Sequence, residues 1–344
     1  MNVSRILAFV KCRLLRDTMT THGYLLINKE ALMITFFTTA RAFRGHMGMI
    51  QTNAIRSWLP LCPHCEILLH GDDEKAAEIA RQFGFKYLEG IECNEHGTPL
   101  LNSLFQRAEE VAKHDWLCHL NADIMLTDDF LPAFELACSQ KSKYLMAGQR
   151  WNFDIQKPWD FDAPNWQSQL RADVKIHGEL FSPKAIDYFV FPKGLWGQLP
   201  AFAMGRQVLD NWLIYRARSL DVPVIDATNA ITIVHQNHDY SFHPHGKSAV
   251  KEGAEAKDNL ELAGGWSHVL SLDDATHLLT ARGLKPAIEV HHLQQRLNTW
   301  STLMPISRLT RFKTQKILLK ARRFLPQSVW SRLVSSLFPH IDDA

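Results

Sequence analysis

The sequence lacks several features that would place it in other classes of protein. No run of 18 apolar residues occurs among its 344 residues, so we expect no membrane-spanning helix. Basic residues interrupt the apolar segment 5–15 and no small-residue cleavage site follows it, so we expect no secretory signal. The net charge of +2 lacks the basic excess of a dedicated nucleic-acid binder, and we expect no nucleic-acid partner.

Signatures of several common enzyme classes are also missing. The sequence contains no GxxxxGK[ST] phosphate loop, no GxGxxG after its first predicted strand, no GxSxG elbow and no HExxH pair. These absences argue against P-loop kinases, ordinary dehydrogenases, serine hydrolases of the α/β type and zincins. We find no internal repeat and no low-complexity tract.

Cysteine is scarce and has no framework spacing. The six cysteines fit a reducing compartment better than a disulfide scaffold, so we expect a cytoplasmic protein. Cys62 and Cys65 form a CxxC segment that could be half of a structural zinc site or a redox pair. No second CxxC follows, and whether this pair binds metal stays open.

What the sequence does contain is an alternation of strand and helix patterns. Strands are predicted at 32–40, 66–70, 85–88 and 116–120, and helices at 45–61, 73–83 and 99–113, with Gly84 ending the second helix. Such alternation predicts an α/β fold with an open, mostly parallel central sheet flanked by helices. Further on we expect strands at 144–148, 187–191, 222–226 and 230–235, a helix at 206–219 and a long loop at 236–267.

Polar segments stand where three of these strands end, at 38–41, 70–73 and 121–123. Open α/β sheets bind ligands beyond the carboxyl ends of their strands, so these segments are candidates for a binding site. Asp123 could hold a divalent cation there, or it could be a turn residue. His235 ends a strand in the same way, and the two side chains could reach one ion if both strands lie in one sheet. His238, His243 and His245 are more simply interpreted as loop histidines.

Asp210 lies early in the predicted helix 206–219. A carboxylate there could serve as a general base toward a sugar hydroxyl, or it could pair with Arg206 or Arg216 on the helix surface. Trp196 and the tryptophan-rich segment 151–166 offer faces for stacking on sugar rings, with core packing as the alternative.

The order of these motifs resembles the nucleotide-sugar-binding half of a GT-A glycosyltransferase, over about residues 33–235. Its anchor is Asn121-Ala122-Asp123, which matches the DxD element of that family with asparagine at the first position. The stretch from DYFVF at 187 to VHQNHDY at 240 also resembles a bacterial and plant group of GT-A-like proteins. The resemblance therefore implies the Rossmann-like GT-A fold.

The resemblance also implies roles for individual residues. Asp123 would hold Mn²⁺ or Mg²⁺ against the donor diphosphate, and His235 would complete the metal site. Asp210 would act as base if the reaction inverts the anomeric centre, or orient the sugar if it retains it. The remaining matched positions would bind the nucleotide sugar, and they are Thr38, Thr39, Arg41, Asp72, Asn102 and Asn121. Lys193 and Arg206 are candidates for offsetting charge on the leaving diphosphate.

These matches divide the chain into four expected regions. A basic leader spans 1–31, the nucleotide-sugar-binding half 32–150, the acceptor-binding half 151–270 and a helical, basic extension 271–344. Residues 305–340 carry eight basic and no acidic residues. They could form a surface helix at the inner face of the plasma membrane, or a helix packed on the domain.

The function that follows is metal-dependent transfer of a sugar from a nucleotide-diphosphate donor to a hydroxyl acceptor. A carbohydrate or lipid-linked acceptor, as in surface polysaccharide or glycolipid synthesis, would fit. Three alternatives stay open: a sugar-nucleotidyltransferase, a non-catalytic nucleotide- or sugar-binding protein, and a zinc protein using the histidines at 235–245. The first would usually carry a glycine-rich basic loop after strand 32–40, which this sequence lacks.

Overall fold

The computed structural model describes residues 33–61, 65–71, 74–239 and 246–303, which belong to one unit. Several sequence predictions lie outside the described residues. They are the basic leader 1–31, the Cys62 side of the CxxC segment, Asp72, His243, His245 and the basic segment 305–340. No helix among the described residues combines the length and apolar character that crossing a bilayer requires.

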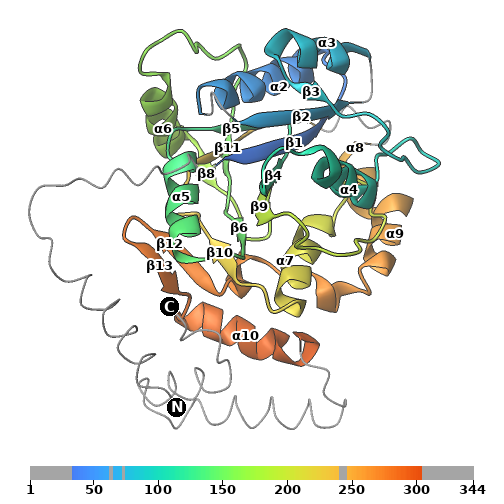
Figure 1. The fold of residues 1–344 in the computed structure, drawn as a ribbon, viewed down its shortest axis with the longest axis vertical. Helices are drawn as coiled ribbons and strands as arrows, with labels where there is room; N and C mark the ends of the chain where they lie inside the picture. Colours follow the sequence, from blue (N-terminus) through green and yellow to red (C-terminus); the bar gives the residue numbers. More distant parts are fainter. Residues whose placement is uncertain (1–32, 62–64, 72–73, 240–245, 304–344) are drawn as a thin grey trace, which may run out of the picture. The chain divides into compact units, whose positions relative to one another are not determined.

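The strands form two sheets (Figure 1). The larger has the order β13-β12-β10-β6-β9-β4-β1-β2-β3 and the smaller the order β5-β11-β7-β8. The strand bounds are β1 Ile34–Ala40, β2 Glu66–Gly71, β3 Lys86–Tyr87, β4 Trp116–Leu120, β5 Ile124–Leu126, β6 Leu145–Ala147, β7 Trp151–Phe153, β8 Glu179–Leu180, β9 Tyr188–Pro192, β10 Val224–Asp226, β11 Ile233–Gln236, β12 His277–Thr280 and β13 Gly283–Pro286.

Helices flank these sheets (Figure 1). The helix bounds are α2 Gly45–Trp58, α3 Glu74–Phe83, α4 Leu101–Val111, α5 Phe130–Gln140, α6 Trp166–His177, α7 Leu209–Ser219, α8 Gly246–Glu252, α9 Ala254–Leu262 and α10 Val290–Leu303. Three short 3₁₀ turns, Leu59–Leu61, Trp266–His268 and Leu272–Asp274, complete the described elements. The predicted mixed α/β class, with a large and mostly parallel central sheet flanked by helices, is confirmed.

The amino-terminal half follows the predicted alternation closely. β1 is buried along nearly its whole length, as its run of apolar and β-branched residues predicts, and it pairs in parallel with β2 and β4. Gly84 has a φ of +72° directly after α3, which is the left-handed conformation expected of a glycine that ends a helix. β1 and β4 therefore end at the same edge of the sheet.

The direction of one central strand does not follow the simple alternation. β9 runs antiparallel to both of its neighbours, β4 and β6. The amino-terminal end of β9 therefore lies at the same sheet edge as the carboxyl ends of β4 and β6. Because of this reversal, the residues that precede β9 lie at the same sheet edge as the polar residues that follow β4.

The long loop predicted over 236–267 is wrong in its second part, where α8 and α9 form. Tertiary contacts hold α9 in place: the Glu255 carboxylate accepts hydrogen bonds from Arg206 Nε and Asn94 Nδ2, both at 2.7 Å. Asn259 Oδ1 accepts from the backbone N–H of Ala203 at 2.8 Å. Glycine and charge made this stretch look like a loop, but its alanine, lysine and glutamate residues are good helix formers.

Two strands, β12 and β13, also lie within the region 271–344 that we expect to be helical, and α10 follows them. β12 pairs in parallel with β10 and so extends the central sheet beyond the predicted acceptor-binding half. The sheet therefore draws strands from three of the four expected regions.

The sugar-stacking hypothesis is wrong for Trp196, which is only 1% exposed. Its ring packs edge-on against Phe191, with 5.2 Å between ring centroids. Trp166 is buried in a second, smaller apolar cluster with Leu170 and Val174. Neither side chain, nor Trp151 or Trp159, lines the cavity described below.

Replacing Trp196 with alanine should lower the free energy of unfolding by about 3–5 kcal/mol, because it removes a large buried ring from a close-packed core. Chemical denaturation followed by circular dichroism measures this. Trp266, which is 61% exposed, provides the matched control, and Trp266→Ala should change stability little. Equal losses in the two variants would contradict a core role for Trp196.

Candidate functional site

A cavity of about 1100 Å³ opens at the edge where β1 and β4 end. Its lining includes the connection from β4 to β5, the segment before β9, the start of α7 and the end of β11. The polar lining residues central to the site are Thr39, Arg41, Asn121, Asp123, Arg150, Asp187, Asp210, His235 and His238. Polar residues after β1 and β4 therefore line one cavity, whereas His70 and Gly71 of the third predicted segment are not among its lining residues.

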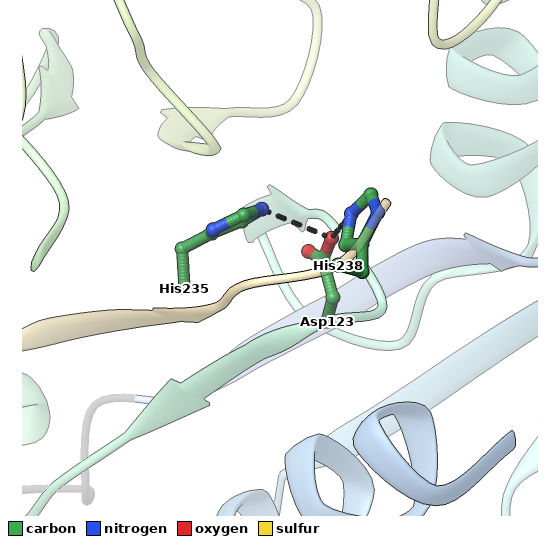
Figure 2. A group of neighbouring side chains, drawn as sticks. All are labelled: Asp123, His235 and His238. Atoms are coloured by element: carbon green, nitrogen blue, oxygen red, sulfur yellow. Dashed lines mark hydrogen bonds and ion pairs between the residues drawn. The ribbon is translucent and has the colours of Figure 1, made fainter. Parts of the chain in front are cut away.

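The carboxylate of Asp123 lies between two histidine rings (Figure 2). Its Oδ2 atom is 3.4 Å from His235 Nε2 and 3.1 Å from His238 Nε2. The ligand atoms of the three side chains lie within 4.8 Å of one another. One carboxylate and two imidazoles thus converge on a small volume beside the cavity.

The smaller sheet, rather than the central one, brings these side chains together. Asp123 immediately precedes β5, and β11 pairs antiparallel with β5 so that His235 stands opposite Ile124. The expected condition, that the strands before Asp123 and His235 share a sheet, is not met because β4 and β11 belong to different sheets, yet the two side chains do meet. Asp123 connects the sheets because β4 belongs to one and β5 to the other.

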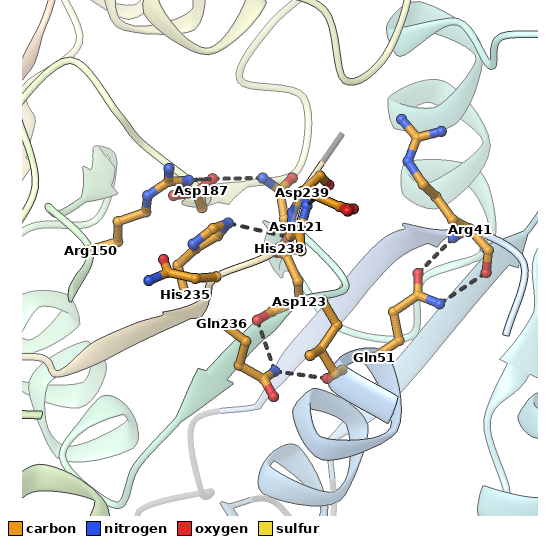
Figure 3. Close-up of polar contacts among 12 residues, drawn as sticks. Arg41, Gln51, Asn121, Asp123, Arg150, Asp187, His235, Gln236, His238 and Asp239 are labelled. Carbon is orange, nitrogen blue, oxygen red and sulfur yellow. Dashed lines mark hydrogen bonds and ion pairs between the residues drawn. The ribbon is translucent and has the colours of Figure 1, made fainter. Parts of the chain in front are cut away.

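A buried hydrogen-bond network holds this connection (Figure 3). Gln236 Nε2 donates to the carbonyl oxygens of Asp123, at 3.0 Å, and Ile50, at 2.7 Å. Asn53 Nδ2 in turn donates to Gln236 Oε1 at 3.0 Å. Because Gln236 is fully buried, these bonds fix the backbone at Asp123 to α2 and to β11.

The charges at this site favour an ionised carboxylate. Burial alone would raise the pKa of Asp123, but the neighbouring His235 and His238 hold it below its ordinary value. His238 Nδ1 lies 2.7 Å from the Asp239 carbonyl oxygen, which can only accept, so Nδ1 carries the hydrogen. That bond orients Nε2 of His238 toward Asp123.

Two buried atoms of this group have no hydrogen-bond partner among the described residues, Asp123 Oδ1 and His235 Nδ1. Buried polar atoms are normally satisfied, and an unsatisfied carboxylate oxygen in a cluster of metal-ligand side chains is an observation that fits a bound cation. The donor set of one carboxylate and two imidazoles is one that transition-metal ions accept.

A second network lies beside the first (Figure 3). Arg150 Nη1 lies 2.9 Å from both carboxylate oxygens of Asp187, and Asn121 Nδ2 donates to Asp187 Oδ1 at 2.7 Å. The Arg150 guanidinium also lies over the Phe181 ring, 5.2 Å from its centroid. Asp187 is nearly buried, so its charge acts on the surrounding groups with little screening by water.

Asp210 lies in the first turn of α7 and lines the same cavity. Burial and, second to it, the negative charge of Asp187 raise its pKa to about 8, while Arg150 acts in the opposite direction. Val208, two residues earlier, has a φ of +91°, a strained conformation for a β-branched residue. Strain of this kind is found where the fold holds a functional side chain in a fixed place.

The other predicted donor-binding residues differ in whether they line the cavity. Thr39 and Arg41 line the cavity, and the backbone of Arg41 is held by Gln51 through bonds of 2.7 and 3.0 Å. Thr38 is fully buried in β1, so its predicted contact with the nucleotide is wrong. Asn102 lies in α4 and is not among the lining residues, which contradicts its predicted role.

The two basic side chains predicted to offset charge on the leaving group, Lys193 and Arg206, differ in position. Lys193 does not line the cavity, and its ammonium donates to the Ala112 carbonyl oxygen at 2.6 Å. Arg206 lines the cavity, but its charge is paired with Glu255 at 2.6 Å. Arg41 and Arg150 also line the cavity, and Arg150 is likewise paired with a carboxylate, that of Asp187.

Sequence reasoning missed Arg150 and Asp187 and discounted His238. Arg150 follows the predicted strand 144–148, so the rule that selected Asp123 could have selected it too. Asp187 gave no such signal, because it precedes a strand whose reversed direction was not readable. His238 follows His235 by three residues, and only the turn after β11 brings the two rings together.

Comparisons with known proteins give a partial similarity. No family model matches the sequence, and no curated protein matches it. Similar solved structures include glucosyl-3-phosphoglycerate synthase from Mycobacterium tuberculosis in complex with Mn²⁺, UDP and glucosyl-3-phosphoglycerate. That alignment has 13% identity and a TM-score of 0.40, and covers 72% of this chain and 87% of that chain.

Another similar structure is TarS 1–349 from S. aureus in complex with UDP-GlcNAc, at 12% identity and a TM-score of 0.29. The alignment covers 36% of each chain, so this chain spans about a third of the TarS fragment's length.

Proposed function

We propose that this protein is a glycosyltransferase that moves a sugar from a nucleotide-diphosphate donor to a hydroxyl acceptor, with the help of a divalent cation. The observation that carries the proposal is that the Asp123–His235–His238 group and the raised-pKa carboxyl of Asp210 line one cavity. A cation-binding group and a separate proton acceptor on one cavity are the two parts that such a transfer needs.

Asp123, His235 and His238 would hold the cation. The ion would supply Lewis-acid stabilisation of the negative charge that develops on the leaving diphosphate. Mg²⁺ prefers oxygen ligands, whereas imidazole ligands suit transition metals. Two imidazoles in the donor set therefore favour Mn²⁺ over Mg²⁺.

Thr39 and Arg41 would bind the nucleotide end of the donor. The network with Gln51 fixes the Arg41 backbone at the exit of β1. A Cβ atom on Gly205 would stand 3.2 Å from Arg41 Nη2, so the Arg41 side chain reaches across to the segment before α7. That position suits a guanidinium that contacts phosphate oxygens.

Asp210 would take the proton of the acceptor hydroxyl if the anomeric centre is inverted. A base is most effective when its pKa lies near the working pH, and burial has moved the pKa of Asp210 to about 8. If the configuration is retained, Asp210 would orient the sugar instead. We propose a carbohydrate or lipid-linked acceptor, as in surface polysaccharide or glycolipid synthesis at the cytoplasmic face of the plasma membrane.

A thermal-shift panel tests this proposal. We expect one of UDP, GDP, CDP, dTDP and CMP to stabilise the protein, only with a divalent cation, and more with Mn²⁺ than with Mg²⁺. At a nucleotide concentration a hundred times the dissociation constant, the stabilisation is about 2.7 kcal/mol. The nucleotide that acts then identifies the donor base.

The same panel separates the alternatives. If no nucleotide acts but a chelator lowers the melting temperature, the protein is better explained as a zinc protein that uses His235 and His238. If a nucleotide binds but its sugar conjugate is never turned over with any hydroxyl acceptor, a non-catalytic binding protein is favoured. Release of pyrophosphate from a nucleoside triphosphate and a sugar phosphate would indicate a sugar-nucleotidyltransferase.

A further inference from the structure

Asn121 and Asp187 stand opposite each other because of the reversed strand β9. The antiparallel pairing of β4 with β9 sets Leu120 against Tyr188, and one step further Asn121 N–H donates to the Asp187 carbonyl oxygen at 3.0 Å. The side chains then meet as well, with Asn121 Nδ2 donating to Asp187 Oδ1 at 2.7 Å. The Asn121 side-chain amide is therefore oriented by the Asp187 carboxylate, to which its nitrogen donates.

An aspartate at position 121 would not fit this arrangement. A carboxylate cannot donate a hydrogen bond, so the contact with Asp187 would be lost. A part-buried carboxylate at position 121 would then face the buried carboxylate of Asp187 at hydrogen-bond distance, with the guanidinium of Arg150 to offset them. The neutral amide of Asn121 satisfies Asp187 without adding charge.

The same carboxylate connects the two ends of the site. Asn121 is two residues from Asp123, in the connection that carries the cation-binding group. On its other side, Asp187 is held by Arg150 and its charge acts on Asp210. Figure 3 shows Asp187 between Arg150 and Asn121.

We propose that Asn121 and Asp187 are positioning residues, whose hydrogen bond ties the connection that carries Asp123 to the Arg150–Asp187 pair beside Asp210. Asn121 thus serves this chain as a donor to Asp187 and not as a ligand of the cation. The catalytic part of this inference rests on the proposed function. The hydrogen bond between Asn121 and Asp187 can be tested without any substrate.

The test exchanges the two side chains. Asn121→Asp and Asp187→Asn each break the pair, whereas the double variant Asn121→Asp/Asp187→Asn restores one carboxylate and one amide with their places reversed. We expect Asn121→Asp to lower the melting temperature and to weaken binding of Mn²⁺ alone by about tenfold, because the connection at Asp123 loses its anchor. The double variant should recover most of both losses.

A cation-ligand role for Asn121 predicts the opposite pattern. Asn121→Asp would then bind Mn²⁺ more tightly than the wild type, since a carboxylate is the stronger ligand, and Asp187→Asn would leave Mn²⁺ binding unchanged. Either result would overturn the proposal, as would a double variant no better than the worse single variant. Isothermal titration calorimetry measures the Mn²⁺ affinities and differential scanning calorimetry the melting temperatures.

A second readout reports on Asp210 rather than on the cation. Asp187 faces Asp210 together with Arg150, and its removal should lower the pKa of Asp210. The fall in melting temperature between pH 5 and pH 8 should therefore be smaller in Asp187→Asn than in the wild type. A variant that is less stable by the same amount at every pH would show that Asp187 has only a structural role.

These measurements also separate this inference from the proposed function. A wild-type protein that binds no nucleotide in the thermal-shift panel contradicts the proposed glycosyltransferase activity. The exchange experiment uses only Mn²⁺, pH and the whole chain, so its outcome does not depend on that panel. Failure of the double variant to recover, in a protein that does bind nucleotide, would overturn the positioning role alone.

Discussion

Asp123→Ala should abolish the metal-dependent stabilisation of this protein by a nucleoside diphosphate. The Asp123 carboxylate is the only anionic member of the group formed with His235 and His238, among the described residues. Its removal leaves two imidazoles, which hold a divalent cation far less tightly than a site that also offers a charged oxygen. We expect the affinity for cation and nucleotide together to fall at least about a hundredfold, which corresponds to about 2.7 kcal/mol.

This loss has a measurable size in a thermal-shift experiment. At the nucleotide concentration that stabilises the wild type by about 2.7 kcal/mol, a hundredfold weaker variant would be stabilised by only about 0.4 kcal/mol. The melting temperature of Asp123→Ala should therefore respond little to Mn²⁺ and nucleotide added together. The nucleotide identified with the wild type is the probe.

Asp128→Ala is the matched control. Asp128 lies five residues further along the chain, is 60% exposed and pairs with Arg171. Its removal should leave the nucleotide shift unchanged, because exposed ion pairs contribute little and Asp128 does not line the cavity. A nucleotide shift that survives intact in Asp123→Ala would show that the cation binds elsewhere.

Asp210→Asn should lower turnover of the donor sugar nucleotide by about 10²–10⁴-fold, with the affinity for the nucleotide retained. The amide has nearly the same shape as the carboxyl group but cannot accept the proton of an acceptor hydroxyl. Asp210 lies at α7, and no described contact joins it to the Asp123 group. The loss should therefore appear in kcat rather than in nucleotide binding.

The pH dependence of turnover provides an independent check. A base must be ionised to work, and the pKa of Asp210 is raised to about 8, first by burial and then by the charge of Asp187. We expect turnover to rise with pH up to about 8 and this limb of the profile to be absent in Asp210→Asn. Residual turnover above about a tenth of the wild-type rate would indicate that Asp210 orients a sugar instead of acting as base.

With rising pH, the effect of Asp210 on stability runs opposite to its effect on turnover. Between its ordinary value of 3.8 and its folded value of about 8, Asp210 keeps a proton in the folded state that the unfolded chain releases. Its contribution to stability is therefore lost as the pH rises through this range. The amide in Asp210→Asn does not titrate, so the variant lacks this loss. The melting temperature of the variant minus that of the wild type should therefore be larger at pH 8 than at pH 5. Lower turnover in a more stable protein would exclude unfolding as the cause.

Local sequence patterns determined the amino-terminal half of the fold. The apolar and β-branched run at β1, the alternation with α2 and α3, and the turn at Gly84 each depend on neighbouring residues, which a sequence displays directly. The position of Asp123 was predictable for the same reason, because the short connection that follows the buried strand β4 lies at the sheet edge. These are short-range effects of side-chain period and backbone conformation.

The tertiary structure alone decided which of the remaining polar residues join the site. The reversed direction of β9 brings Asp187 to Asn121, and pairing of β11 with β5 brings His235 and His238 to Asp123. The buried Glu255–Arg206 pair likewise holds α9, which composition alone suggested was a loop. Each of these contacts joins residues far apart in the sequence, and strand direction and pairing depend on how the whole core packs, which no local pattern records.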